Sequence, residues 1–288
     1  MPRQSGPARG NDPHAWLLRE DGSVRLHAIR HGEGYPIRFV LVHGLASCAR
    51  LWDAVGMALA ARGHGAVAVD LRGHGDSPKP DDGYDFETIT GDLLPFLDNR
   101  PVLAGQSFGG NVAVDLAARR PDAVSAIACV DGGAIDLAAR FSTVDEAVLA
   151  LRPPYEEFEG TPLVAQEMYL RTAHADWPET SIEAALAAYD VDTEGRIRSR
   201  LSWARHQQII RAMWNTPPSP RWPQIRVPAV FLMASERMRA GVDAALAALP
   251  DAEVVWFDGA DHDLHAQKPD EVADHFTRLL ARARPGCS

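Results

Sequence analysis

The chain has 288 residues, of which 46% are hydrophobic and 24% are charged, values typical of a globular protein with one large core. Its formal net charge is −10 at pH 7 and it contains no long basic run, so we expect no nucleic-acid partner. No stretch approaches the roughly 18 consecutive apolar residues of a membrane span, so we expect no membrane partner either.

The opening stretch, MPRQSGPARGNDPH, has no apolar run of the kind found in secretory signals, and we expect residues 1–13 to be a disordered lead-in. Three cysteines, Cys48, Cys129 and Cys287, are widely spaced and include no C-x-x-C pair. This pattern is untypical of a disulfide framework and fits a reducing compartment. We therefore expect a cytoplasmic protein.

The first half of the chain alternates short apolar runs with amphipathic windows. Residues 15–31 alternate around a Glu-Asp-Gly turn and predict a hairpin. After them the predicted order is strand 37–44, helix 50–63, a strand and glycine-rich loop over 65–75, helix 85–99, a strand and turn over 101–110, helix 111–121, and a strand and loop over 124–133. This alternation predicts an α/β fold, with a mostly parallel sheet flanked by helices.

The pattern changes between about Ile135 and Trp222, where helical windows are separated by prolines and no strand is evident. Strands 227–235 and 252–259 then resume the earlier pattern, and a helix over 269–284 closes the chain. The sequence therefore predicts a helical insertion within a sheet domain.

The residues Gly105-Gln106-Ser107-Phe108-Gly109 form a G-x-S-x-G sequence between a predicted strand and a predicted helix. A nucleophile on such a sharp turn has a strained backbone, which requires small neighbours. The turn exposes the Ser107 hydroxyl and places the Phe108 N–H at a helix N-terminus, where it can stabilise an anion. A glycine-rich turn with a capping serine is the alternative. The stretch has neither the Walker A lysine nor the G-x-G-x-x-G register of a phosphate site.

A second motif, His43-Gly44-Leu45, ends another predicted strand. An acyl-transfer site needs a second oxyanion donor beside Phe108, and the Leu45 backbone N–H is placed to provide it. A His-Gly pair alone is weak, because many strands end in glycine.

Four stretches of the chain resemble the α/β-hydrolase family: LVHG, VDLRGHGDS, AGQSFGGNVA and DHDLHAQKPDEV. They occur in the family's order and span nearly the whole chain. The resemblance implies the α/β-hydrolase fold, with residues 1–134 and 222–288 as the core and 135–221 as a helical cap. It does not identify the substrate.

The family's catalytic histidine follows the last strand, in a pattern like G-H-x-x-H-x-x-x-P. The resemblance therefore makes His262 the general base and His265 a neighbouring polar residue. Asp261 occupies the position before the base, which is often glycine in the family. A charge there can raise the pKa of His262, depending on where its side chain points.

A metal site is the alternative interpretation of the two closely spaced histidines, His262 and His265. His74 and Asp76 are further ligands on paper, but a site needs defined geometry and the chain has no H-E-x-x-H pattern. We expect no metal and no cofactor.

The acid of a Ser-His-Asp triad is displaced in this sequence. The resemblance places it shortly after the strand that follows the cap, where Met238 stands. Asp131, at the end of the strand after the nucleophile helix, is the acid that we favour, because some family members carry it there. Glu236 and Asp243 are alternatives, and so is loss of the acid.

These residues predict a serine hydrolase that cleaves a carboxylic ester or lactone of a small to medium apolar substrate through an acyl-enzyme. Serine at position 107 argues against epoxide hydrolysis and dehalogenation, which use a carboxylate nucleophile in this family. Carbon–carbon bond hydrolysis of a diketone, another acyl transfer, and a small-molecule binding protein with a slow or vestigial triad stay open. The sequence carries no signal for an oligomeric state.

The insertion also contains aromatic and histidine side chains. The aromatic residues are candidates for an apolar pocket, although such stripes are more often core packing; they are Tyr155, Phe158, Tyr169, Trp177, Tyr189, Trp203 and Trp214. We expect His174 and His206 to be surface or packing residues.

Overall fold

The computed structural model describes residues 24–153 and 158–283, so the predicted lead-in and the first part of the predicted hairpin lie outside the described residues. Within them, a seven-stranded sheet has the order β1-β3-β2-β4-β5-β8-β9. Strand β1 runs antiparallel to β3 and the other neighbouring strands are parallel. The strands are β1 (Ala28–His31), β2 (Ile37–Val42), β3 (Gly65–Val69), β4 (Val102–Gln106), β5 (Ala126–Val130), β8 (Ala229–Met233) and β9 (Ala252–Trp256).

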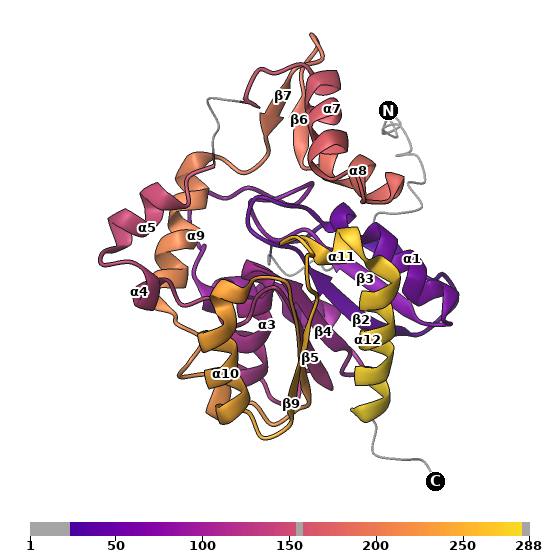
Figure 1. The fold of residues 1–288 in the computed structure, drawn as a ribbon, viewed down its shortest axis with the longest axis vertical. Helices are drawn as coiled ribbons and strands as arrows, with labels where there is room; N and C mark the ends of the chain where they lie inside the picture. Colours follow the sequence, from indigo (N-terminus) through magenta and orange to yellow (C-terminus); the bar gives the residue numbers. More distant parts are fainter. Residues whose placement is uncertain (1–23, 154–157, 284–288) are drawn as a thin grey trace, which may run out of the picture.

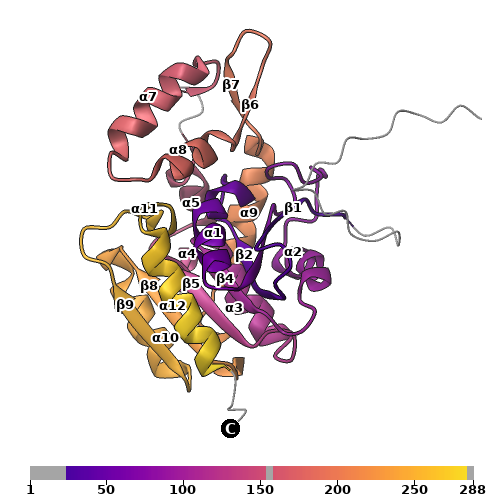
Figure 2. The ribbon, with the colours of Figure 1, turned by 90° about the vertical axis from the view of Figure 1, so that its right-hand side faces the viewer.

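Helices cover both faces of this sheet, as Figures 1 and 2 show. One face packs against α1 (Asp53–Ala61), α11 (Leu264–Gln267) and α12 (Pro269–Arg282). The other packs against α2 (Phe86–Leu93), α3 (Phe108–Arg119) and α10 (Arg239–Ala248). Short 3₁₀ turns adjoin these helices at η1 (Ala49–Trp52), η2 (Leu94–Phe96), η3 (Trp222–Gln224) and η4 (Glu236–Met238). The predicted α/β class and the mostly parallel sheet are confirmed.

The hydrophobic pattern explains these elements. Strands β3, β4, β5 and β8 are buried along their whole length, as expected for parallel strands covered on both faces. Helix α12 is amphipathic, and its buried stripe consists of Val272, Ala273, Phe276, Leu279 and Leu280. Helix α2 begins after Asp85, whose carboxylate accepts the Thr88 N–H at 2.9 Å.

Residues 135–221, here called the insertion, connect β5 to the segment before β8. Figures 1 and 2 show its elements gathered at one end of the core. They are α4 (Leu137–Arg140), α5 (Val144–Ala150), α7 (Leu163–Ala173), α8 (Glu179–Leu186), β6 (Tyr189–Val191), β7 (Ile197–Ser199) and α9 (Trp203–Asn215).

The expectation that the insertion contains no strand is wrong. Strands β6 and β7 pair antiparallel, with Tyr189 opposite Ser199. The turn between them is closed by the Asp192 carboxylate, which accepts the N–H groups of Glu194 and Arg196 at 2.9 Å each. Strands of three residues are too short to show a clear alternation of apolar and polar side chains.

The structure gives the state of two cysteines and the length of the helices relative to a membrane. Cys48 and Cys129 are buried free thiols, whereas Cys287 lies outside the described residues. In residues 24–153 and 158–283, every helix is too short or too polar to cross a bilayer.

Candidate active site

Ser107 occupies a sharp turn between β4 and α3. Its backbone φ of 52° and ψ of −117° lie in a region that side-chain-bearing residues rarely adopt. A Cβ on Gly105 would lie 2.0 Å from the Gly109 carbonyl oxygen, and a Cβ on Gly109 would lie 2.4 Å from that of Val42. The glycines of the G-x-S-x-G sequence are therefore required by close backbone contacts, in agreement with the predicted need for small neighbours.

Leu45, from the loop after β2, lines the same cavity as Ser107 and Phe108 of the turn. Within residues 24–153 and 158–283, the Ser107 hydroxyl makes no hydrogen bond, and neither the Leu45 nor the Phe108 N–H has an acceptor. Phe108 is also the first residue of α3, where N–H groups have no partner within the helix. The two N–H groups predicted to form an oxyanion hole thus have no acceptor in the described part of the protein.

Asp131 and His262 form an ion pair although they are 131 positions apart in the sequence, with His262 Nδ1 lying 2.6 Å from Asp131 Oδ2. Asp131 is fully buried at the end of β5. Its Oδ1 accepts the N–H groups of Ala234 at 3.0 Å and Ser235 at 2.9 Å, and its Oδ2 also accepts the Ser235 hydroxyl at 2.7 Å. These donors follow β8, so the neighbouring strand end holds the carboxylate toward His262.

The pair has shifted pKa values in opposite directions. Burial alone would raise the pKa of Asp131, but hydrogen bonds from His262 and Ser235 outweigh it and hold that pKa below its usual value. Burial alone would lower the pKa of His262, but the Asp131 hydrogen bond and the charge of Asp263 raise it above its usual value. The geometry thus favours a charged pair, as a base that must become imidazolium requires.

The other candidate acids lie elsewhere. Glu236 is exposed, and both of its carboxylate oxygens accept hydrogen bonds from the Arg239 guanidinium. Asp243 is exposed on α10. Met238 lines the cavity instead of holding the histidine. Of the three acids considered, Asp131 is the one placed against His262 by the described part of the chain.

The loop that carries His262 is held from two sides. Gln106, the residue before Ser107, donates its side-chain N–H to the His262 carbonyl at 3.1 Å. Asp261 turns toward the insertion, where its Oδ2 accepts the Trp177 Nε1–H at 2.8 Å and the His174 Nδ1–H at 3.1 Å. The acidic neighbour that raises the pKa of His262 is therefore Asp263 rather than Asp261. No sequence pattern indicated the Gln106 contact.

His265 lies in the core. It is fully buried, its ring centroid lies 4.3 Å from that of Trp52, and neither ring nitrogen has a hydrogen-bond partner in the described residues. Burial lowers its pKa to about 3. Its neighbour in the motif, His262, is instead paired with Asp131, so the two histidines have different environments and do not face one common ligand.

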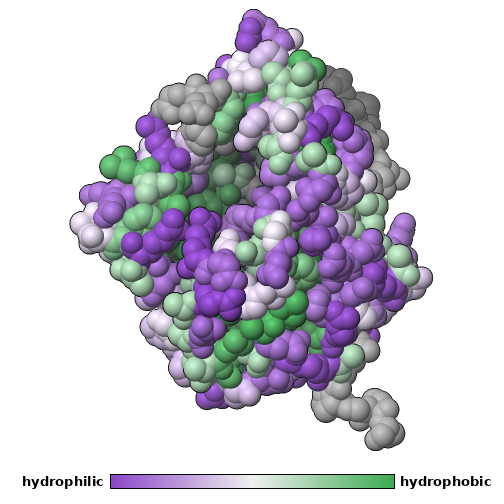
Figure 3. Space-filling view, in the orientation of Figure 1, coloured by the Kyte–Doolittle hydropathy of each residue, from purple (hydrophilic) through white to green (hydrophobic). Residues whose placement is uncertain are grey.

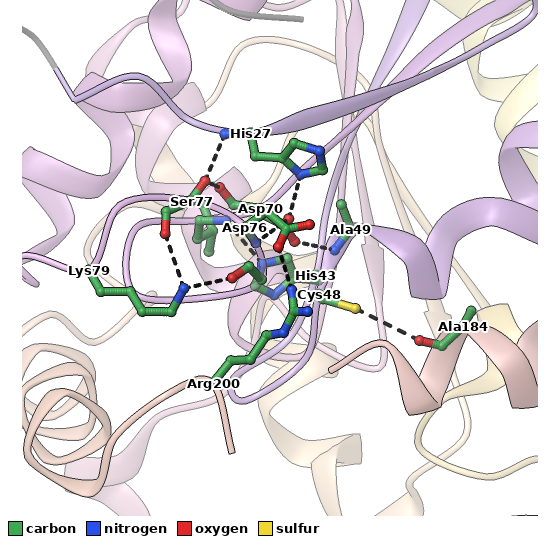
Figure 4. A network of polar contacts seen from close by, with 12 residues as sticks. His27, His43, Cys48, Ala49, Asp70, Asp76, Ser77, Lys79, Ala184 and Arg200 are labelled. Carbon is green, nitrogen blue, oxygen red and sulfur yellow. Dashed lines mark hydrogen bonds and ion pairs between the residues drawn. The ribbon is translucent and has the colours of Figure 1, made fainter. Parts of the chain in front are cut away.

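One cluster in the described residues has spacing compatible with a metal ion, and it comprises His27, Asp70 and Asp76. Figure 4 shows that protein donors surround it. Asp70 accepts hydrogen bonds from the Ala49 N–H at 2.6 Å, the Asp76 N–H at 3.0 Å and His27 Nδ1 at 2.7 Å. Asp76 pairs with Arg200 of the insertion at 2.6 Å. This network ties the loop after β3 to its neighbours and explains the cluster without a metal.

A cavity of about 300 Å³ lies between the core and the insertion. Figure 3 shows a hollow on this face with hydrophobic residues inside it. The residues lining the cavity are Leu45, Ala46, Ser107, Phe108, Ile135, Leu137, Arg140, Leu151, Pro153, His206, Met213, Arg237, Met238 and His262.

This lining differs from the expected one. Its apolar part from the insertion is aliphatic, and none of the aromatic candidates in the described residues contributes; Tyr155 lies outside them. Phe158 and Tyr189 pack against each other instead, and Tyr169 is exposed. His206 is buried, its ring centroid lies 5.4 Å from that of Trp203, as expected for a packing residue, and it also lines the cavity.

Residues 39–275 match the sequence pattern described as the alpha/beta hydrolase family, and the chain belongs to this family. Lipase LipV of Mycobacterium tuberculosis is 30% identical over 263 residues, which span 87% of this chain and 95% of that protein. The 2-(acetamidomethylene)succinate hydrolase of Mesorhizobium japonicum is 26% identical over 267 residues, with 90% and 92% coverage. A crystal structure of E-2-(acetamidomethylene)succinate hydrolase has the same fold, with a TM-score of 0.74, 24% identity, and coverage of 93% and 100%. Relatives named lipase and hydrolase support a hydrolytic activity for this chain.

Proposed function

We propose that this protein is a serine hydrolase that cleaves a carboxylic ester or lactone through an acyl-enzyme. The observation that carries the proposal is the Asp131–His262 pair, with a 2.6 Å contact, opening on the cavity that Ser107 also lines. A buried carboxylate that receives four hydrogen bonds, one of them from a histidine, is the arrangement required to orient a general base.

The reaction begins when His262 removes the proton of the Ser107 hydroxyl. Because the Nδ1–H of His262 donates to Asp131, the unprotonated Nε2 is the nitrogen that accepts this proton. The Ser107 oxygen attacks the carbonyl carbon, and the free N–H groups of Leu45 and Phe108 stabilise the oxyanion. The imidazolium then donates its proton to the leaving oxygen, which leaves an acyl-enzyme.

Water completes the cycle. His262 removes a proton from the water, hydroxide adds to the acyl carbon, and Ser107 leaves with the proton returned by the imidazolium. Every step uses side chains and backbone N–H groups of this chain together with water, so the proposed reaction needs no cofactor. In this proposal residues 135–221 act as a cap over a core of 1–134 and 222–288, and the aliphatic side of the cavity holds the apolar body of a small to medium substrate.

Covalent labelling tests the proposal directly. A fluorophosphonate probe should modify the purified protein at Ser107, with loss of labelling in Ser107→Ala and of turnover in an ester assay. A panel of esters, lactones and diketones then separates ester hydrolysis from carbon–carbon bond cleavage. Binding of the panel compounds without labelling or turnover would instead favour a binding protein on a hydrolase scaffold.

A further inference from the structure

Two arginines line the otherwise largely apolar cavity. Arg140 is the last residue of α4 and Arg237 lies in η4, next to the start of α10. Both residues are exposed, and both contribute to the lining of the cavity. In residues 24–153 and 158–283, neither guanidinium has a carboxylate partner; that of Arg140 lies 5.0 Å from the Phe141 ring centroid.

The acids nearest to these arginines in sequence are already engaged. Glu236 pairs with Arg239, and Asp136 caps α4 by accepting the Ala139 N–H at 3.0 Å. By contrast, six arginines elsewhere on the insertion pair with carboxylates; they are Arg171, Arg196, Arg200, Arg205, Arg211 and Arg221. The chain has a net charge of −10, yet these two arginines line one cavity and have no carboxylate partner in the described residues. They can therefore bind an anionic group of a ligand.

A third polar group faces the same cavity from α9. His206 is 2% exposed, and its Nδ1 is buried without a hydrogen-bond partner in the described residues. Burial lowers its pKa to about 4, so the ring is neutral at pH 7. Because Nδ1 is buried inside the protein, the ring can meet a polar atom of a ligand only through Nε2, which makes no hydrogen bond in the described residues.

We propose that the ester or lactone cleaved at Ser107 carries a free carboxylate, held by Arg140 and Arg237, with His206 contacting a second polar atom. This inference rests on the proposed function for the position of the reacting carbonyl. Guanidinium groups bind carboxylates through charge-assisted, often paired hydrogen bonds, which lysines do not reproduce. The substrate class is therefore an apolar body that bears both an ester and a carboxylate.

Arg237 also affects the base. Its positive charge opposes protonation of His262, although Asp131 and Asp263 outweigh it. A substrate carboxylate bound to Arg237 would neutralise that charge while the imidazolium forms. The subsite thus links anion binding to proton transfer through one residue.

Two matched substrate pairs test the subsite, one with the anion on the leaving group of the ester and one with the anion on its acyl part. The first pair is 4-acetoxybenzoate and 4-acetoxybenzamide; the second is methyl hydrogen adipate and methyl adipamate. In each pair a carboxylate is replaced by a neutral amide of similar size. We expect kcat/KM for the carboxylate to exceed that for the amide by about 10-fold or more in one pair.

The variants Arg140→Gln and Arg237→Gln should each reduce that ratio by about 10-fold, mainly through KM, because each removes one charge-assisted contact. Arg171→Gln is the matched control, since it makes the same charge change on an exposed, paired arginine outside the cavity; its ratio should equal that of the wild type. A wild-type ratio near one in both pairs, or an unchanged ratio in both variants, would overturn the proposal. A larger advantage for 4-acetoxybenzenephosphonate than for 4-acetoxybenzoate would overturn the carboxylate assignment.

Equilibrium binding separates this inference from the proposed function. Calorimetry with 4-hydroxybenzoate, adipate and their amides measures anion recognition without turnover. Carboxylate-selective binding that Arg237→Gln weakens, in a protein that a fluorophosphonate does not label, would keep the subsite and refute the hydrolase. Labelling and turnover without any carboxylate preference would refute the subsite and keep the hydrolase.

Discussion

Replacing Asp131 by asparagine should disable the proposed base by changing which ring nitrogen of His262 carries the proton. The Oδ1 of Asp131 accepts two backbone N–H groups, so the oxygen of an asparagine would keep that position. The asparagine NH₂ group would then occupy the place of Oδ2, which lies 2.6 Å from His262 Nδ1. Two N–H groups cannot form a hydrogen bond with each other. The asparagine NH₂ group would therefore donate to an unprotonated Nδ1, and the ring proton of His262 would move to Nε2.

Histidine in that state cannot accept the proton of Ser107. We therefore expect kcat for an activated ester to fall by about 10³- to 10⁴-fold, a loss of about 4–5.5 kcal/mol in transition-state stabilisation, with KM changed little. The same variant should still bind substrate, because Asp131 is fully buried behind the histidine and does not line the cavity. Steady-state kinetics with a chromogenic ester measures both parameters, and a thermal melt checks that the variant is folded.

Glu236→Gln is the matched control, since it makes the same charge change at another of the candidate acids. Glu236 is exposed and paired with Arg239, so this variant should keep kcat within about twofold of the wild type. A large loss in Glu236→Gln together with a small one in Asp131→Asn would reassign the acid and refute this reasoning.

Three further predictions concern His262 and its surroundings. The acidic limb of the kcat/KM profile reports the pKa of His262, so Asp263→Asn should move that limb to lower pH and Arg237→Gln to higher pH; shifts of the same sign would contradict the assignment of charges. Gln106→Leu removes the bond to the His262 carbonyl and should lower kcat by about 10-fold at an unchanged fold, as judged by circular dichroism, whereas a wild-type kcat would rule out a positioning role. His265→Leu should stabilise the protein while leaving ester turnover in place, because the buried ring has no hydrogen-bond partner in the described residues. Folding lowers the pKa of His265 from 6.5 to about 3, so the unfolded chain binds a proton below pH 6.5 that the folded protein does not, and the histidine destabilises the folded state more as the pH falls. The stability advantage of His265→Leu, measured in urea titrations, should therefore grow by about 2 kcal/mol between pH 7 and pH 5. An advantage that is constant with pH would show that the ring is not held neutral.

The sheet and its helices follow from local patterns. Strands such as β4 and β5 are continuous apolar runs, and α12 repeats its apolar residues at helical spacing, so each element is evident within a short window of sequence. Ser107 was predictable for a similar reason, since the close contacts at Gly105 and Gly109 permit few other residue types. These features depend on neighbours along the chain.

The remaining site contacts depend on neighbours in space. Asp131 was one of three candidate acids, because the sequence does not show that the donors after β8 surround its carboxylate. The cavity that His206 and Arg140 line together with Arg237 depends on how the insertion packs on the core. The β6–β7 pair was missed because three residues per strand carry too little periodicity.

Because the proposed acid lies at the end of β5, the residues after β8 have other roles in the candidate site. In the arrangement that the family resemblance implies as usual, a carboxylate would stand at position 238, where this chain has Met238. Here Ser235 supplies hydrogen bonds to Asp131, and the next turn presents Arg237 and Met238 to the cavity. A carboxylate at position 238 would lie next to the Arg237 guanidinium and compete with any anionic ligand. The displaced acid is therefore consistent with the proposed carboxylate subsite, because it leaves the Arg237 guanidinium without a neighbouring carboxylate.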